Sequence, residues 1–264
     1  MKGTQRDVDR LRPIDDPMFR VMALSKAFCE EVLRVLLEDK GLKVVKSTPQ
    51  AAVTNLRGRS VVLDALCELS DGRLVNVEVQ RADDDDLQRR VRYYASLVTT
   101  DRTPPGARFA DVPDVCVALV CEFDPLGEGC PLYHVDRVVR EGGRALDNGL
   151  EELYVNALAR DGGEVSALMR VFVEAEAYDE ERFPETSRVK RRLRETEEGR
   201  KDMGSVIEEI REEIRAECIA EGKAEGTLET LGRLVRDGLV SVQDAAASAG
   251  VDADEIRRTL AAEG

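Results

Sequence analysis

The 264-residue sequence contains no tryptophan and only one histidine, His134, and aromatic residues make up 4% of it. A single imidazole cannot build a His-rich zinc site, and any Ser/His/Asp or Cys/His mechanism would depend on that one position. His134 lies in a short alternating segment, residues 130–135, which is typical of a strand and favours a structural role. Carboxylates with a hard metal ion are the best catalytic groups that remain.

The sequence also lacks a C-x-x-C pair and a long apolar run. Its six cysteines lie mostly in apolar segments, where a thiol behaves as a small hydrophobic group, so we expect a reducing environment. The longest apolar run, residues 115–121, is far shorter than the ~20 residues that cross a bilayer, and no apolar segment follows the amino terminus. We therefore expect a cytoplasmic protein without a membrane partner.

Positive charge is in deficit, because 53 acidic residues outnumber 39 basic ones and the net charge is −14. This balance excludes a generally basic nucleic-acid binder, so that any nucleic-acid contact must be local or mediated by a metal. The length allows a substantial core, while the 35% of charged residues suggests long, solvated helices. One domain with an appendage is the expected organisation.

Two neighbouring apolar segments, residues 61–69 and 73–80, carry acidic residues in their interiors. If the intervening Ser70-Asp71-Gly72 is a three-residue hairpin loop with a left-handed glycine, Asp64 lies directly opposite Glu78. The same register pairs apolar side chains with apolar side chains on the other face. Two carboxylates roughly 5 Å apart repel each other unless they are protonated or bridged by a cation, so the hairpin predicts a divalent metal site.

Other segments predict the elements around this hairpin. N-cap and helix-start signals place helices at Pro17 and at Ser25, and apolar spacing places another from Leu87 onward. Strands are expected at residues 43–46, 115–121 and 133–137, and further helices at residues 149–159 and 164–178. A helix between the hairpin and a buried strand forms a crossover unit, which predicts an α/β fold with a central mixed β-sheet flanked by helices.

Beyond residue 183 the composition becomes almost wholly charged and small. A 4-3-4 spacing of apolar residues forms a seam too narrow to fold alone, which predicts a homo-oligomer through the C-terminal helices. The seam consists of Met203, Ile207, Ile210 and Ile214. Gly222 and Gly226 are expected to break the helix, since each costs about 1 kcal/mol. Short helices follow, one of them capped by Ser241.

These changes in composition predict three parts, residues 1–182, 183–226 and 227–264. The first is the α/β domain and the second a charged helical linker with a possible coiled coil. The third is a small helical module whose glycine turn is compatible with a helix-turn-helix. DNA binding, packing and oligomerisation all remain open for this last module.

Five stretches of the first 180 or so residues carry a further signal through their order. They are Asp15-Asp16-Pro17-Met18-Phe19, Leu63-Asp64, Asn76-Val77-Glu78-Val79-Gln80, Arg90-Val91-Arg92-Tyr93-Tyr94 with Ser96, and Glu122-Phe123-Asp124-Pro125-Leu126-Gly127. With this ordered set the sequence resembles the metal-dependent nucleases of the PD-(D/E)xK superfamily, in particular the nuclease-family transposases or recombination-promoting nucleases. The resemblance implies a restriction-endonuclease-like core, followed here by an all-α tail.

The resemblance further implies that Asp64 and Glu78 bind magnesium, with manganese as a substitute, and that the Val79 carbonyl completes the protein ligands. Gln80 stands where the superfamily name has lysine, and glutamine can orient a water molecule but supplies no cation. The implied activity is that of a Mg-dependent DNA endonuclease, in which metal-activated water hydrolyses phosphodiester bonds without an organic cofactor. Family analogy extends this to recombination or mobile-element movement.

Accessory roles are also implied by the resemblance. Asp16 and either Glu30 or Glu31 are candidate acids near the metal, although a solvated helix charge is an alternative for each. Nucleic-acid contacts are implied for a second set of residues, which could instead belong to an ordinary exposed helix surface. That set consists of Arg90, Arg92 and Tyr93. The acidic run 83–86 is expected to cap the following helix.

A second interpretation of the whole chain remains open. It is a catalytically inactive protein that keeps the nuclease fold and acts as an oligomerising or DNA- or partner-binding module. The acidic balance and the missing lysine favour it, whereas the presence of both Asp64 and Glu78 opposes it.

Overall fold

The computed structural model describes residues 8–55, 58–83, 86–236, 239–249, 251, 253–254 and 257–258. The chain divides into two compact units, Met1–Val206 and Ile207–Gly264. Within the described ranges, no helix combines the length and apolar character that crossing a membrane requires.

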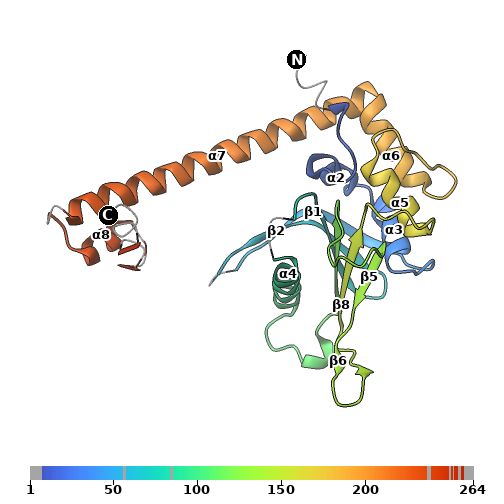
Figure 1. The fold of residues 1–264 in the computed structure, drawn as a ribbon, viewed down its shortest axis with the longest axis horizontal. Helices are drawn as coiled ribbons and strands as arrows, with labels where there is room; N and C mark the ends of the chain where they lie inside the picture. The colour runs from blue at the N-terminus through green and yellow to red at the C-terminus, as the bar shows by residue number, and fades with distance from the viewer. Residues whose placement is uncertain are drawn as a thin grey trace. The chain divides into compact units, whose positions relative to one another are not determined.

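A six-stranded mixed sheet forms the centre of the first unit (Figure 1). Its strands, in spatial order, are β1 (Val44–Val53), β2 (Val61–Leu69), β3 (Leu74–Gln80), β4 (Val115–Cys121), β8 (Leu150–Asn156) and β5 (Leu132–Val135). The pairs β1–β2, β2–β3 and β5–β8 are antiparallel, while β3–β4 and β4–β8 are parallel. A separate two-stranded sheet contains β6 (Val138–Val139) and β7 (Arg144–Ala145).

The β2–β3 hairpin has the register that its loop predicts. The N–H of Leu69 donates to the carbonyl of Arg73 over 2.9 Å, and Ala65 pairs with Val77. Gly72 has a φ of +93°, a conformation that glycine adopts without the Cβ clash of other residues. Because side chains alternate along strands, this register leaves the side chains of Asp64 and Glu78 on the same face.

Helices cover both faces of the sheet, and α3 and α4 lie on opposite ones. The helices of this unit are α2 (Asp16–Met22), α3 (Lys26–Leu36), α4 (Leu87–Arg102), α5 (Glu164–Val173) and α6 (Pro184–Glu195), with the short η1 (Phe109–Asp111). On β2, Glu68 bonds to Arg102 of α4, whereas the adjacent Cys67 contacts a Ser47 hydroxyl shared with Cys29 of α3. By alternation, Asp64 and Glu78 face α4. The predicted α/β fold with a mixed sheet flanked by helices is confirmed.

The predicted helix starts are also confirmed. The Ser25 hydroxyl accepts the N–H of Phe28 over 3.3 Å at the start of α3, and α2 has proline in its first turn. At the start of α4 the Asp86 carboxylate accepts the N–H of Arg89 over 3.0 Å, as expected of a capping acid. Asp84 and Asp85 of the same acidic run lie outside the described residues.

Two predictions about the segments of the sheet differ from the structure. Residues 149–159 do not form a helix, because residues 150–156 form β8 between β4 and β5. The strand expected at residues 43–46 extends to Val53 and includes Pro49. Proline is tolerated there because β1 is an edge strand, where one missing backbone donor leaves no internal hydrogen bond broken.

Helix α7 (Glu197–Arg236) crosses the boundary between the units and has no break at Gly222 or Gly226. The predicted interruption is therefore wrong, because the surrounding alanine, glutamate and lysine residues are strong helix formers that outweigh two glycines. Helix α8 (Val242–Ala249) starts as predicted, with the Ser241 hydroxyl accepting the N–H of Asp244 over 3.1 Å. The last of the expected short helices, which would open at Asp252 or Asp254, lies partly outside the described residues.

The second unit has a small apolar cluster of its own. Ala245 and Ala246 of α8 are buried in it, and partly buried side chains of α7 and of the following turns pack against them. Those side chains are Leu228, Leu231, Val235, Val240, Val242, Val251 and Ala253. The division of the chain at 182/183 and 226/227 stays a prediction.

Candidate active site

Asp64 and Glu78 lie across from each other on β2 and β3 and are linked through both backbones. The N–H of Val79 donates to a carboxylate oxygen of Asp64 over 2.9 Å, and the N–H of Asp64 approaches the Glu78 carboxylate at 3.2 Å. The amide of Asn76 donates to the same Glu78 oxygen over 2.9 Å. Glu78 is only 5% exposed, so this carboxylate is held almost entirely by protein groups.

The electrostatics of this acid pair disfavour two negative charges. Burial raises the pKa of Asp64, and the nearby Asp16 raises it further, against the opposing effects of the Val79 N–H and of Arg90. Burial also raises the pKa of Glu78 well above its usual range, with the charge of Asp64 as the second cause. The pair therefore holds a proton or an external cation more readily than isolated carboxylates do.

Gln80 and Arg90 meet beside the acid pair. A terminal guanidinium nitrogen of Arg90 donates to the side-chain oxygen of Gln80 over 2.7 Å. The charge of Arg90 lowers the pKa values of both Asp64 and Glu78, which places it within electrostatic reach of the two acids. The site thus contains a cation, but the cation comes from α4 rather than from the strand position of Gln80.

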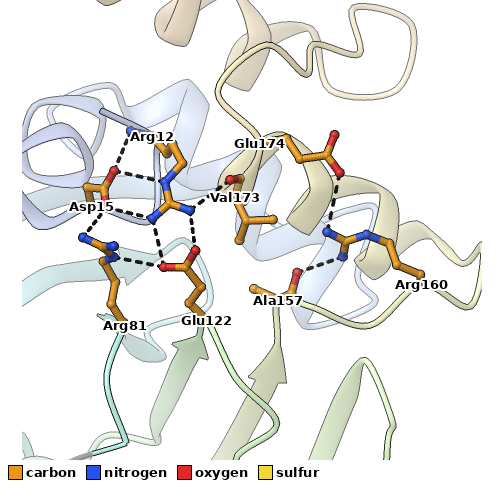
Figure 2. A network of polar contacts seen from close by, with 8 residues as sticks. All are labelled: Arg12, Asp15, Arg81, Glu122, Ala157, Arg160, Val173 and Glu174. Carbon is orange, nitrogen blue, oxygen red and sulfur yellow. Dashed lines mark hydrogen bonds and ion pairs between the residues drawn. The ribbon is translucent and has the colours of Figure 1, made fainter. Parts of the chain in front are cut away.

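Asp16 reaches the acid pair from α2, and a network of charges holds the start of that helix (Figure 2). The Arg12 guanidinium pairs with Asp15 over 3.2 Å and bonds to a Glu122 oxygen over 2.9 Å. Arg81, directly after β3, pairs with the same two acids over 3.0 and 2.9 Å. Two arginines and two acids therefore alternate around one ring of contacts, which ties the segment before α2 to the ends of β3 and β4.

The Arg12 guanidinium also donates to the Val173 carbonyl over 3.1 Å, at the end of α5. Burial acts to raise the pKa of Glu122, but hydrogen bonds from Arg12 and Arg81 outweigh it and lower that pKa. A cleft of about 690 Å³ lies against this network, with Asp16 in its lining. The two arginines therefore favour the charged form of Glu122, and the cleft beside the ring has Asp16 at its rim.

The other candidate acids have structural partners instead. Glu30 accepts the N–H of Val44 over 2.9 Å and pairs with Arg34 over 2.5 Å. Glu31 accepts the N–H of Thr186 over 2.7 Å at the start of α6, where it acts as a capping group. The structure gives neither carboxylate a contact with the acid pair.

The remaining predicted residues come from β3 and α4, next to the acid pair. Val79 is half-buried between Glu78 and Gln80, and Arg92 and Tyr93 line a hollow beside the start of α4. The Tyr93 hydroxyl accepts from the Asn55 amide over 3.3 Å and donates to the carbonyl of Arg59. Tyr93 therefore holds the residues before β2 against α4.

Several residues that shape the site were not predicted from the sequence. Asn76 is fully buried on the strand face of the acids, and its side-chain oxygen has no hydrogen-bond partner among the described residues. Burial and the charge of Glu78 raise the pKa of Tyr94 to about 12, which places its hydroxyl near the pair. The polar Asn76 in an apolar strand was a readable signal. The contact of Arg12 with Glu122 was not, because 110 residues separate the two.

Comparison with known families gives one result. Residues 28–157 match the family model described as PD-(D/E)XK nuclease family transposase. Comparisons with curated proteins and with solved structures give no significant match. The matched segment contains β2, β3, α4 and β4, and with them the acid pair, Gln80 and Arg90. Residues 28–157 therefore belong to the PD-(D/E)XK nuclease family transposases.

Proposed function

We propose that the protein is a divalent-metal-dependent DNA endonuclease with Asp64 and Glu78 as its metal ligands. The observation that carries this proposal is the pair of carboxylates on adjacent strands, the half-buried Asp64 and the buried Glu78, both with raised pKa values. Such a pair fits a hard cation, because carboxylate oxygens are its preferred ligands and the cation removes the repulsion. Magnesium is the ion that we propose, with manganese as its substitute.

The surrounding donors fit magnesium better than zinc. Among the residues that the structure describes, no three His, Cys, Asp or Glu side chains gather closely enough to hold one ion. Zinc sites in proteins generally use three or four such ligands, whereas magnesium is often held by one or two carboxylates and keeps several waters. The unpaired oxygen of Asn76 and the carbonyl of Val79 are further oxygen donors on these strands.

A bound divalent ion would supply two effects, a lower pKa for a coordinated water and compensation of charge on the phosphoryl oxygens. Asp64 and Glu78 hold the ion, and Asp16 adds negative charge at the rim of the neighbouring cleft. Gln80 orients the attacking water through its amide, which Arg90 positions by a 2.7 Å hydrogen bond. Arg90 and Arg92 contact backbone phosphate, with Tyr93 beside them.

The test is calorimetric titration of magnesium and manganese combined with plasmid nicking. Asp64→Asn keeps an acceptor for the Val79 N–H but removes a charge, so we expect metal binding to be lost and nicking to fall by about 100-fold or more. Glu68→Gln is the matched control, since Glu68 lies on the same face of β2 but pairs with Arg102. EDTA should abolish nicking by the wild type. Undiminished nicking by Asp64→Asn would refute the assignment.

The competing proposal is a catalytically inactive binding module, favoured by glutamine at the position of the superfamily lysine. The same titration separates the two, because a wild type that binds no divalent ion would support the inactive module. Promotion of recombination or mobile-element movement rests on the family relationship and needs cleavage first. Oligomerisation through the C-terminal helices rests on the apolar row of α7, in which Ile214 is 54% exposed.

A further inference from the structure

A hollow of about 660 Å³ lies between the start of β2 and the first half of α4. Arginines and tyrosines dominate its lining, and we name it the arginine groove after them. They are Arg59, Arg89, Arg90, Arg92, Tyr93 and Tyr94. Arg59 precedes β2, and the other five belong to α4.

The charge of this groove is opposite to that of the chain. The whole chain carries a net charge of −14, yet among the described residues that line the groove four are arginines and one, Asp86, is an acid. Asp86 pairs with Arg89 over 3.1 Å. Within the described part of the chain, no carboxylate forms an ion pair with Arg59, Arg90 or Arg92. Arg90 also acts on the charges of the acid pair. Arg59 and Arg92 have no acidic partner among the described residues, and in an acidic protein two such guanidinium groups on one hollow indicate a site for an external anion.

The groove has two walls that are fixed to each other. Tyr93 of α4 donates its hydroxyl to the backbone carbonyl of Arg59 and accepts from the Asn55 amide. Because this contact uses the backbone of Arg59, it holds the residue in place while leaving its guanidinium available. Arg59 therefore faces the arginines of α4 from a second element.

The groove is also continuous with the acid pair. Arg90 lines it and donates to Gln80, and Tyr94 lies close enough to Glu78 for that charge to raise its pKa. A chain of anionic groups bound along the groove would therefore continue to the acid pair. A nucleic-acid strand has this form, because its phosphates repeat along a chain of sugars that carry aromatic bases. Proteins that bind such strands combine a cationic groove with aromatic side chains, as this hollow does.

We propose that the arginine groove binds the phosphate backbone of a DNA strand beside the acid pair, with Arg59 and Arg92 as phosphate contacts on opposite walls. This rests on the proposed nuclease function and adds Arg59, and hence the segment before β2, to the DNA-binding surface. Each phosphate contact releases condensed counterions, so that the logarithm of the binding constant falls with the logarithm of salt concentration.

The experiment measures fluorescence anisotropy of labelled single-stranded and duplex DNA with the full chain in EDTA, across a salt series. Arg59→Gln and Arg92→Gln should each weaken binding and reduce the salt slope by about 0.7 for single strands or about 0.9 for duplexes. Arg108→Gln is the matched control, because Arg108 is an exposed arginine outside the groove and pairs with Asp111. It removes the same charge but should leave the slope unchanged. A competing mononucleotide separates backbone binding from capture of a single phosphate group.

Three outcomes would overturn the proposal. They are a wild type that does not bind DNA at low salt, groove variants with the wild-type slope, and a control that loses as much as they do. Since EDTA removes any metal, binding here is independent of hydrolysis. Groove binding without metal binding would refute the nuclease proposal alone, whereas metal-dependent nicking with unchanged slopes would refute the groove alone. Thermal unfolding of each variant shows that the fold is retained.

Discussion

At the scale of single residues, Gln80 and Arg90 together supply an amide and a cation at the position where the superfamily name has one lysine. Gln80 accepts a hydrogen bond from Arg90 over 2.7 Å, so the amide of the strand and the cation of α4 form one unit. Arginine keeps its charge at all ordinary pH values, while lysine can lose a proton when it is buried. The unit can therefore hold negative charge and orient a water molecule, but it cannot transfer a proton through its cation.

A first prediction concerns the stability of the metal-free protein. Burial and the charge of Asp64 raise the pKa of Glu78, so the folded state binds protons more tightly than the unfolded state. This contribution is fully present below the unfolded pKa of about 4.3 and is lost as the pH rises through the folded pKa. Glu78→Gln removes the charge but keeps an acceptor for Asn76, and in EDTA at pH 8 it should be more stable than the wild type by about 1–3 kcal/mol.

Urea unfolding at pH 4.5 and pH 8 checks this prediction. The difference between Glu78→Gln and the wild type should be small at pH 4.5 and positive at pH 8. Glu68→Gln, on the same sheet face but paired with Arg102 and Lys46, should stay within about 1 kcal/mol of the wild type. If Glu78→Gln were instead less stable at pH 8, protein groups alone would neutralise the acid pair and the argument for a cation would fail.

The residues of the site differ in how far sequence could predict them. The Asp64–Glu78 geometry follows from the length of one loop, because a hairpin register is fixed by local arithmetic. Glu31 shows the limit of that approach, since the N–H group that it caps belongs to Thr186, more than 150 residues away. The ring of Arg12, Asp15, Arg81 and Glu122 depends likewise on contacts between distant segments. Local patterns carry no information about such partners.

At the scale of elements, β8 shows how an apolar period can mislead. Leu150, Leu153, Tyr154 and Ala157 recur at helical spacing, yet residues 150–156 lie in the sheet. The pairing of Leu153 with Ala118 of β4 and with His134 of β5 supplies backbone partners on both sides, and this tertiary context outweighs the periodicity. The hairpin, α3, α4 and β4 were predictable because cap, spacing and apolar run agree within each of them.

Helix α6 is fixed to the domain by a buried lysine, which gives a second prediction. The Lys190 ammonium donates to three backbone carbonyls, those of Val171, Glu174 and Ala177, over 2.6–2.8 Å. Burial, with the charge of Arg194, lowers the pKa of Lys190 to about 7. Lys190→Met would leave these carbonyls without their donor, so we expect a loss of about 2–4 kcal/mol in the free energy of unfolding.

Urea denaturation at pH 7 measures that loss. Arg188→Met is a suitable comparison on the same helix, because Arg188 is exposed and pairs with Glu185 one turn away. That variant should lie within about 1 kcal/mol of the wild type. Equal stabilities for the two variants would mean that the three carbonyls find other donors, and that α6 is held by its apolar contacts alone.

At the scale of the whole molecule, the end of the first domain differs between two criteria. The change of composition gives one position, and the packing of the structure gives another. The sequence becomes highly charged after residue 183, but the compact first unit extends to Val206. The intervening α6 is charged on one side while it contributes Val189, Lys190 and Leu193 to the buried interior. Composition averages over the two sides of an amphipathic helix, so it cannot show that one of them is buried.

The two boundaries lead to a third prediction, on truncated chains. A chain of residues 1–206 keeps α6, with the Lys190 contacts and the Glu31 cap, so it should unfold cooperatively and retain metal and DNA binding. A chain of residues 1–182 lacks these contacts and exposes the apolar surface that α6 covers. It should lose about 3 kcal/mol or more, or fail to fold.

Circular dichroism during urea unfolding compares the two truncated chains, and sedimentation compares the longer one with the full chain. If residues after 206 carry the oligomer contact, the full chain should sediment as an oligomer and the chain of residues 1–206 as a monomer. A chain of residues 1–182 as stable as that of residues 1–206 would contradict the role given to α6. An oligomer that persists in residues 1–206 would instead locate the contact in the α/β domain, where the row of isoleucines on α7 has no part.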